Sequence, residues 1–317
     1  MKIKKALKIL AVTKNYKAND INKCRRIIEI YETLKSISEK DDLIDDKSLK
    51  AYLLEGLELK GLPTDEISAF IDNSLSSLAI LTQKTIQLFC FPYAGGGSDF
   101  YKKWKKKYNS TFFFDIELVE YSGRGEKTGT PLIKDFTEIV TQLADEIGRR
   151  INRPFAFFGH SLGAILAFEI AKKIKIDKKI SPIGLFLSGC PAPDYLPDQI
   201  SLQNLSDDEF IAKIIQLGGI PQEIINEPKP LNFFLPYLKN DFSLIDTYTS
   251  LNTDLFTVPL VVFTGDKDPK VSVKQVMGWE SYTNSFFECH VMPGDHFFVK
   301  DESAILEKIN LHLGEII

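Results

Sequence analysis

The sequence predicts an α/β fold with a mostly parallel central sheet and helices on both of its faces, preceded by a small all-helical module. After about residue 85, short apolar runs alternate with helical stretches. These runs are continuous rather than alternating in polarity, which is typical of strands buried on both faces. Before that point the chain is polar, lysine-rich and helical in its hydrophobic period. We therefore expect a helical extension over 1–85, of unknown role, and an α/β domain over 86–317.

Each element of the domain is expected from a run of this kind. Strands and helices that follow one another in this way imply parallel strands joined by crossover helices. The expected strands are Ile86–Phe91, Phe112–Val119, Phe155–Phe158, Ile183–Leu187, Val258–Phe263 and Phe286–Met292. The expected helices are Phe136–Ile151, Leu162–Ile174, Val273–Tyr282 and Ala304–Leu313.

Charge and composition exclude several classes of function. The 317 residues include 39 Lys+Arg and 43 Asp+Glu, so a net charge of −4 gives no reason to expect nucleic-acid binding. No apolar run reaches the roughly 18 residues of a membrane span. The basic start has too short an apolar stretch for a secretory signal, so we expect no membrane association and a cytoplasmic protein. The four cysteines lack metal-ligand spacing, and we expect no metal.

The strongest catalytic signal is Gly159-His160-Ser161-Leu162-Gly163, which joins an apolar strand directly to an apolar helix. A strand that reverses into a helix within one residue strains the backbone at the serine and leaves no room for a Cβ on the flanking residues. The turn exposes the Ser161 hydroxyl at a helix N-terminus, where backbone dipoles favour negative charge. Ser161 is the predicted nucleophile.

His296 is the predicted base, because a serine needs a base to take its proton. It lies in a loop between the last strand and the last helix, whereas the other three histidines lie in the serine turn, in a strand run and on the last helix. The acid is expected between serine and histidine in the sequence. Asp268 is favoured because it lies deeper in its loop and is fixed by Pro269. Asp266 is the runner-up and Asp194 a third candidate.

Two backbone amides should stabilise the oxyanion of an acyl-transfer intermediate. One is that of Leu162, directly after the nucleophile. The other should come from the loop 91–98, whose three consecutive glycines let amides point inward, and Tyr93 and Ala94 are both candidates. The alternative interpretation, a phosphate-binding loop, lacks the Gly-Lys-Ser/Thr ending of that motif.

Several stretches together resemble one family, the type II thioesterases of nonribosomal peptide and polyketide synthesis, in the α/β-hydrolase superfamily. They are FCFPYAGGGSDFYKKW, VEYSGRGEK, FFGHSLGAILAFE, FLSGCPAPDY, LSDDEFIAKIIQLGGIPQE, FFLPYLKNDFSLIDTY, FTGDKDPKV and MPGDHFFV, all in the family's order. The resemblance runs from about residue 86 to the C-terminus. Two positions depart from the family's usual pattern: Ser122 stands where proline is usual, and Asp295 where glycine is frequent.

The resemblance implies an activity and assigns roles to the candidates. Ser161, Asp268 and His296 would form a catalytic triad, and the amides of Ala94 and Leu162 an oxyanion hole. The substrate would be an acyl group on the phosphopantetheine arm of an acyl or peptidyl carrier protein. The enzyme would release or edit such groups in nonribosomal peptide, polyketide or fatty-acid-like synthesis, with no cofactor.

A helical lid at about 194–253 is also implied, and its many large apolar residues could either roof an acyl chamber or pack into a core. The lysine cluster at 102–107 could steer an acidic carrier or be an ordinary solvated helix face. Two other functions stay open: a generic carboxylesterase or lipase on the same triad, and a non-catalytic module that binds carrier proteins.

Overall fold

The computed structural model describes residues 86–108, 112, 114–196, 202, 205–216, 228–248 and 255–316. The chain divides into two units, Met1–Gln83 and Lys84–Ile317, and all described residues belong to the second. The helical module expected over 1–85 therefore lies outside the described residues.

Six parallel strands form the centre of this unit, in the order β2-β1-β3-β4-β5-β6. Every residue of the four inner strands is buried, which explains their continuous apolar sequences. The predicted α/β class and its strands are confirmed. The strands are β1 (Ile86–Phe91), β2 (Phe114–Leu118), β3 (Phe155–His160), β4 (Leu185–Ser188), β5 (Leu260–Gly265) and β6 (Phe287–Met292).

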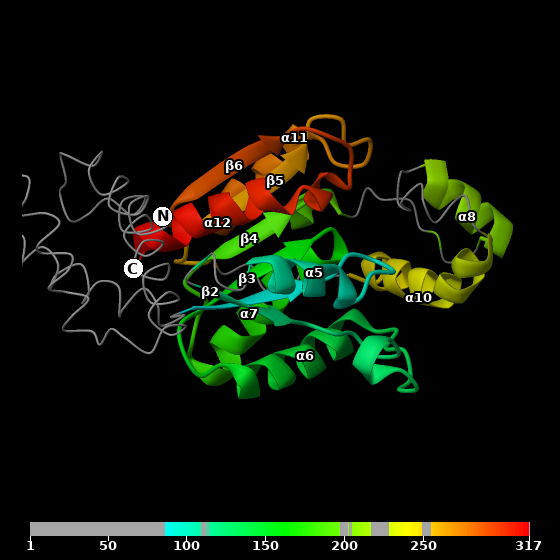
Figure 1. The fold of residues 1–317 in the computed structure, drawn as a ribbon, viewed down its shortest axis with the longest axis horizontal. Helices are drawn as coiled ribbons and strands as arrows, with labels where there is room; N and C mark the ends of the chain where they lie inside the picture. Colours follow the sequence, from blue (N-terminus) through cyan, green and yellow to red (C-terminus); the bar gives the residue numbers. More distant parts are fainter. Residues whose placement is uncertain are drawn as a thin grey trace, which may run out of the picture. The chain divides into compact units, whose positions relative to one another are not determined.

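Helices cover both faces of the sheet (Figure 1). On one face, α6 (Phe136–Arg150) and α7 (Leu162–Lys178) pack into a large apolar cluster. On the other face, α5 (Asp99–Tyr108) and α12 (Glu302–Ile316) form a second cluster. The sheet thus lies between two layers of helix, an arrangement that places the ends of its strands together along one edge.

Local sequence explains where several helices begin and end. Asp135 caps α6 by accepting a hydrogen bond from the amide of Glu138. α7 is buried almost all round as predicted, but it runs four residues past the expected end at Ile174 and closes at Lys179, which has a left-handed backbone. The predicted helix Val273–Tyr282 is a short α11 (Val273–Met277) followed by a 3₁₀ turn, Gly278–Tyr282.

Two helices of the expected lid, α8 (Asp207–Gln216) and α10 (Pro228–Asp246), lie beyond the carboxyl ends of the strands (Figure 1). Much of their apolar surface forms a small separate core, so the packing interpretation holds for that part of the lid. Its buried members are Leu202, Phe210, Ile214, Leu235 and Leu238. Within the described part of the chain, no helix combines the length and the apolar character that crossing a membrane requires.

Candidate active site

Ser161 stands in a strained turn between β3 and α7, with φ 55° and ψ −120°. Positive φ is uncommon for a residue other than glycine and costs about 1–3 kcal/mol. A Cβ on Gly159 would lie 2.1 Å from the carbonyl oxygen of Gly163, and a Cβ on Gly163 would lie 2.2 Å from the carbonyl oxygen of Phe91. Both neighbours are backbone atoms, so the two glycines are required sterically.

The structure brings the predicted nucleophile, base and acid together. His296 Nε2 lies 3.2 Å from Ser161 Oγ, and His296 Nδ1 lies 2.7 Å from Asp268 Oδ2. The second carboxylate oxygen of Asp268 accepts hydrogen bonds from the amides of Lys270 (2.8 Å) and Val271 (3.2 Å). The Asp268 carboxylate is therefore held at both oxygens, and it in turn fixes the orientation of the imidazole.

The two other acid candidates lie elsewhere. Asp266 is exposed and accepts a hydrogen bond from the amide of Gly294, which shapes the loop that carries His296. Asp194 accepts a hydrogen bond from the hydroxyl of Tyr282. Neither carboxylate is bonded to His296 in this geometry.

The electrostatic environment keeps the His296 imidazole neutral. Burial lowers the pKa of His296 below its ordinary value, and the positive charge of Lys270 acts in the same direction. The hydrogen bond to Asp268 opposes this effect but does not overcome it. A neutral imidazole whose Nδ1–H is donated to Asp268 presents its Nε2 lone pair to the serine hydroxyl.

His160, the residue before the serine, is a second neutral imidazole behind the first. It is fully buried, and burial lowers its pKa well below the ordinary value. Its Nδ1 lies 3.0 Å from Ser188 Oγ, and its ring centroid lies 5.1 Å from that of His296. The two rings pack against each other, so His160 limits the movement of the His296 ring.

The loop after β1 lies against the first turn of α7, where an oxyanion would form. A Cβ on Gly163 would also lie 2.6 Å from the carbonyl oxygen of Pro92, so loop and helix touch at the backbone. Leu162 is the first residue of α7, and its amide therefore has no acceptor within the helix. Among the described residues, the Ala94 amide is likewise free of any hydrogen bond.

A buried ion pair that sequence analysis did not identify holds this loop to the lid. Arg124 donates two hydrogen bonds of 2.7 Å to Asp241 of α10 and a third, of 2.9 Å, to the carbonyl of Gly96. Asp241 also accepts from the amide of Gly95 at 2.7 Å. Burial alone would lower the pKa of Arg124, but its contacts with Asp241 raise it. The ion pair thus links the loop next to Ala94 to the lid.

A cavity of about 240 Å³ opens at Ser161 and His296 between the sheet edge and the lid. Phe242 of α10 contributes to its wall, so part of the lid does roof a chamber. Lys270 is an unpredicted member of the wall, and its ammonium lies 5.5 Å from the centroid of the Phe242 ring. The signal was its place directly after Asp268-Pro269. The other wall residues are Leu162, Ile165, Cys190, Pro191, Tyr195, Leu196, Leu202, Ile245, Asp246, Pro269, Val271 and Gln275.

The arrangement is suited to acyl transfer. A base oriented by a carboxylate can take the proton of the serine hydroxyl, and two free amides can receive an oxyanion. Ser161, His296 and Asp268 form a hydrogen-bonded relay. Among the described residues, the one group of His, Cys, Asp and Glu side chains spaced to hold a metal includes none of these three.

A family model described as a thioesterase domain matches residues 86–313. The gramicidin S biosynthesis protein GrsT of Aneurinibacillus migulanus is 32% identical over 234 residues, which cover 73% of this chain and 87% of that protein. The medium-chain S-acyl fatty acid synthase thioesterase of Rattus norvegicus is 32% identical, with 67% of this chain and 81% of that protein covered.

Two solved structures of proteins from biosynthetic pathways also match this chain. ClbQ, from the colibactin nonribosomal peptide and polyketide pathway, matches with a TM-score of 0.69 and 31% identity over 73% of this chain and 98% of that one. The type II thioesterase BorB, from the borrelidin biosynthetic cluster, matches with a TM-score of 0.66 and 30% identity, covering 72% and 93%.

Proposed function

Because the chain belongs to the thioesterase family, we propose that it hydrolyses the thioester between an acyl group and the phosphopantetheine arm of a carrier protein. The resemblance to type II thioesterases that the sequence indicates is confirmed, and so are its classes as hydrolase and thioesterase. The proposed role is the release or editing of acyl groups during the assembly of peptides, polyketides or fatty-acid-like chains.

Acylation of Ser161 is the first step. His296 takes the hydroxyl proton, and the Ser161 oxygen attacks the thioester carbonyl. The amides of Ala94 and Leu162 donate hydrogen bonds to the resulting oxyanion; the loss of one such donor typically slows catalysis about 10²–10³-fold. The pantetheine thiol then leaves with the proton that His296 returns.

Water completes the reaction. The same imidazole takes a proton from a water molecule, which attacks the acyl-serine ester and frees the carboxylic acid. Asp268 stabilises the imidazolium that forms in each half-reaction and holds the tautomer that faces Ser161. The observation that carries the proposal is this hydrogen-bonded relay at the mouth of a cavity.

Substitutions at the relay test the proposal on a carrier protein loaded with a radiolabelled acyl group. Ser161→Ala should abolish acyl release while thermal unfolding stays near wild type. Asp268→Asn should slow release by about 10⁴-fold, because the amide favours the wrong imidazole tautomer. Asp266→Asn, on an exposed carboxylate of the same loop, is the matched control and should remain active. Release by Ser161→Ala at the wild-type rate would contradict the assignment.

The choice of substrate separates this function from that of a generic esterase. A carrier-directed thioesterase should cleave acyl-carrier protein with a higher kcat/KM than the same acyl group on free pantetheine or on a simple alcohol. Faster turnover of the oxygen ester, with no benefit from the carrier, would favour the carboxylesterase alternative.

The lysines of α5 provide a candidate docking surface for an acidic carrier. Four of them are exposed: Lys102 pairs with Asp99 and Lys107 with Glu302, whereas Lys103 and Lys106 form no ion pair with the described residues. Replacing both Lys103 and Lys106 by glutamate should lower kcat/KM for acyl-carrier protein, and the loss should be larger at low salt. Turnover of acyl-pantetheine should not change, and an equal loss on both substrates would argue against docking.

A further inference from the structure

Two histidines and a glutamate meet where the edge strand β6 faces α12. Glu288 and His290 are two residues apart on β6 and share one face of the strand, and His312 lies on α12. The two Nε2 atoms lie 3.2 Å apart. One carboxylate oxygen of Glu288 is 3.4 Å from His290 Nε2, and the other is 3.5 Å from His312 Nε2.

The separation of the two histidine nitrogens is close to the distance between neighbouring ligands of a tetrahedral metal site. With metal–nitrogen bonds of about 2.0–2.1 Å and a tetrahedral angle, neighbouring ligand atoms lie about 3.3–3.4 Å apart. The two Nε2 atoms are 3.2 Å apart, close to such an edge, and each imidazole faces a different oxygen of Glu288, at 3.4 and 3.5 Å. One ligand atom from each of the three residues lies within 4.8 Å of the other two, so one cation can contact all three side chains. Two imidazoles and one carboxylate are a ligand set that zinc uses with a fourth position left for water.

The surroundings hold the two imidazoles in place and leave the site open to solvent. Aromatic rings hold both imidazoles: His290 lies 5.4 Å from the ring of Phe263, and His312 lies 5.6 Å from that of Phe286. The Glu288 side chain is 41% exposed, so solvent can reach the fourth position.

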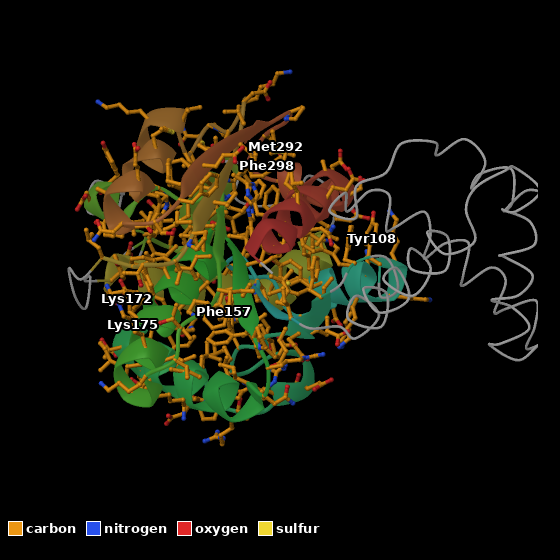
Figure 2. All side chains as sticks on the ribbon, turned by 90° about the vertical axis from the view of Figure 1, so that its left-hand side faces the viewer. Tyr108, Phe157, Lys172, Lys175, Met292 and Phe298 are labelled. Atoms are coloured by element: carbon orange, nitrogen blue, oxygen red, sulfur yellow. The ribbon has the colours of Figure 1, made fainter. Side chains whose placement is uncertain are left out.

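We propose that Glu288, His290 and His312 bind a divalent transition-metal ion of the zinc type, which links β6 to α12. β6 precedes and α12 follows the loop that carries His296. An ion that joins them therefore cross-links the two elements on either side of this loop. The two ends of this loop are also held by apolar packing, since Met292 and Phe298 belong to the same apolar cluster (Figure 2). Because the ligands converge only in the folded chain, the ion stabilises folding.

Zinc binding to the full-length chain tests this proposal independently of any thioesterase activity. The protein is stripped with a chelator, and Zn²⁺ is titrated in competition with a chromogenic indicator. We expect one high-affinity equivalent per chain and a rise in melting temperature with added Zn²⁺. Co²⁺ should give the visible absorption bands of a tetrahedral site.

Four variants locate the site. His290→Gln, His312→Gln and Glu288→Gln should each weaken Zn²⁺ binding at least tenfold and remove the Zn²⁺-dependent rise in melting temperature. The matched control is Cys289→Ser, on the opposite face of β6, which should bind like wild type. Glu288 is half-exposed, so its variant retains the fold even if a histidine variant does not. Binding that is absent in wild type, unchanged in Glu288→Gln or lost in Cys289→Ser would overturn the proposal.

Discussion

Removing the carboxylate of Asp241 should both destabilise the α/β unit and slow its chemistry. The side chains of Asp241 and Arg124 are 1% and 8% exposed. Asp241→Ala leaves the guanidinium buried without its counter-charge and deprives the Gly95 amide of its acceptor. Breaking a buried pair in this way costs about 3–5 kcal/mol. At roughly 2–4 °C per kcal/mol for a unit of this size, the melting temperature should fall by about 6–20 °C.

The catalytic effect follows from the position of the ion pair. Asp241 holds the glycine loop whose Ala94 amide is proposed to bind the oxyanion. If that amide is displaced, kcat should fall by up to about 10²–10³-fold. KM should change less, because the cavity wall at Phe242 and Lys270 remains.

Tryptophan fluorescence is a specific assay for the unfolding step. The chain has two tryptophans, Trp104 and Trp279; both are buried, and both lie within 84–317. The control is Lys239→Ala on the same helix, which removes a partly exposed ion pair with Asp207 and a hydrogen bond to the Leu205 carbonyl and should cost only about 1–2 kcal/mol. An Asp241→Ala variant with the same melting temperature as this control and an unchanged kcat would refute the reasoning.

A double substitution separates the two effects. In Arg124→Met with Asp241→Leu, both charges are gone, and burying apolar groups in their place is often neutral for stability. Unfolding should therefore recover relative to Asp241→Ala. The rate should not recover, because the Gly95 amide and the Gly96 carbonyl still lack the partners that fix the loop.

Three further results are expected. Because His296 must be neutral to act and its pKa is lowered, kcat/KM should rise with pH to a plateau, with a midpoint below about 6.5; a midpoint clearly above that value would contradict the lowered pKa. Lys270→Met removes a positive charge that lowers this pKa, so the midpoint should move upward, and an unchanged pH profile would show that the charge is not felt. Gly163→Ala places a Cβ against the Phe91 carbonyl and should cost about 1–3 kcal/mol together with most activity, measured by melting and acyl release; a fully active variant would contradict the close approach.

The sequence could predict the sheet and the relay because both depend on local patterns. A continuous apolar run indicates a doubly buried strand, as in β3. The serine turn is recognised from its glycines, which the backbone contacts at Gly159 and Gly163 require. Strand ends in a parallel sheet meet at one edge, so a loop histidine and a loop aspartate after two strands are natural partners for the serine.

The remaining features depend on contacts that no local pattern contains. Arg124 and Asp241 are 117 residues apart, and nothing near either one indicates the other. Lys270 follows Asp268-Pro269 directly in the sequence, but no local pattern shows that it lines the cavity beside Phe242. Burial lowers its pKa to about 8. Its effect on His296 is therefore a property of the packed cavity rather than of a motif.

Contacts between residues of different segments also explain why the chain can have Ser122 where its family usually has proline. Proline would fix one backbone angle in this turn. Here Gly123 and Gly125 adopt φ angles of 85° and 52°, and a Cβ on Gly125 would lie 2.0 Å from the carboxylate of Glu120. Glu120 is itself held by Ser98, whose hydroxyl donates to it at 2.6 Å. Because these contacts already determine the path of the chain, the serine substitution leaves the turn in place to present Arg124 to the lid.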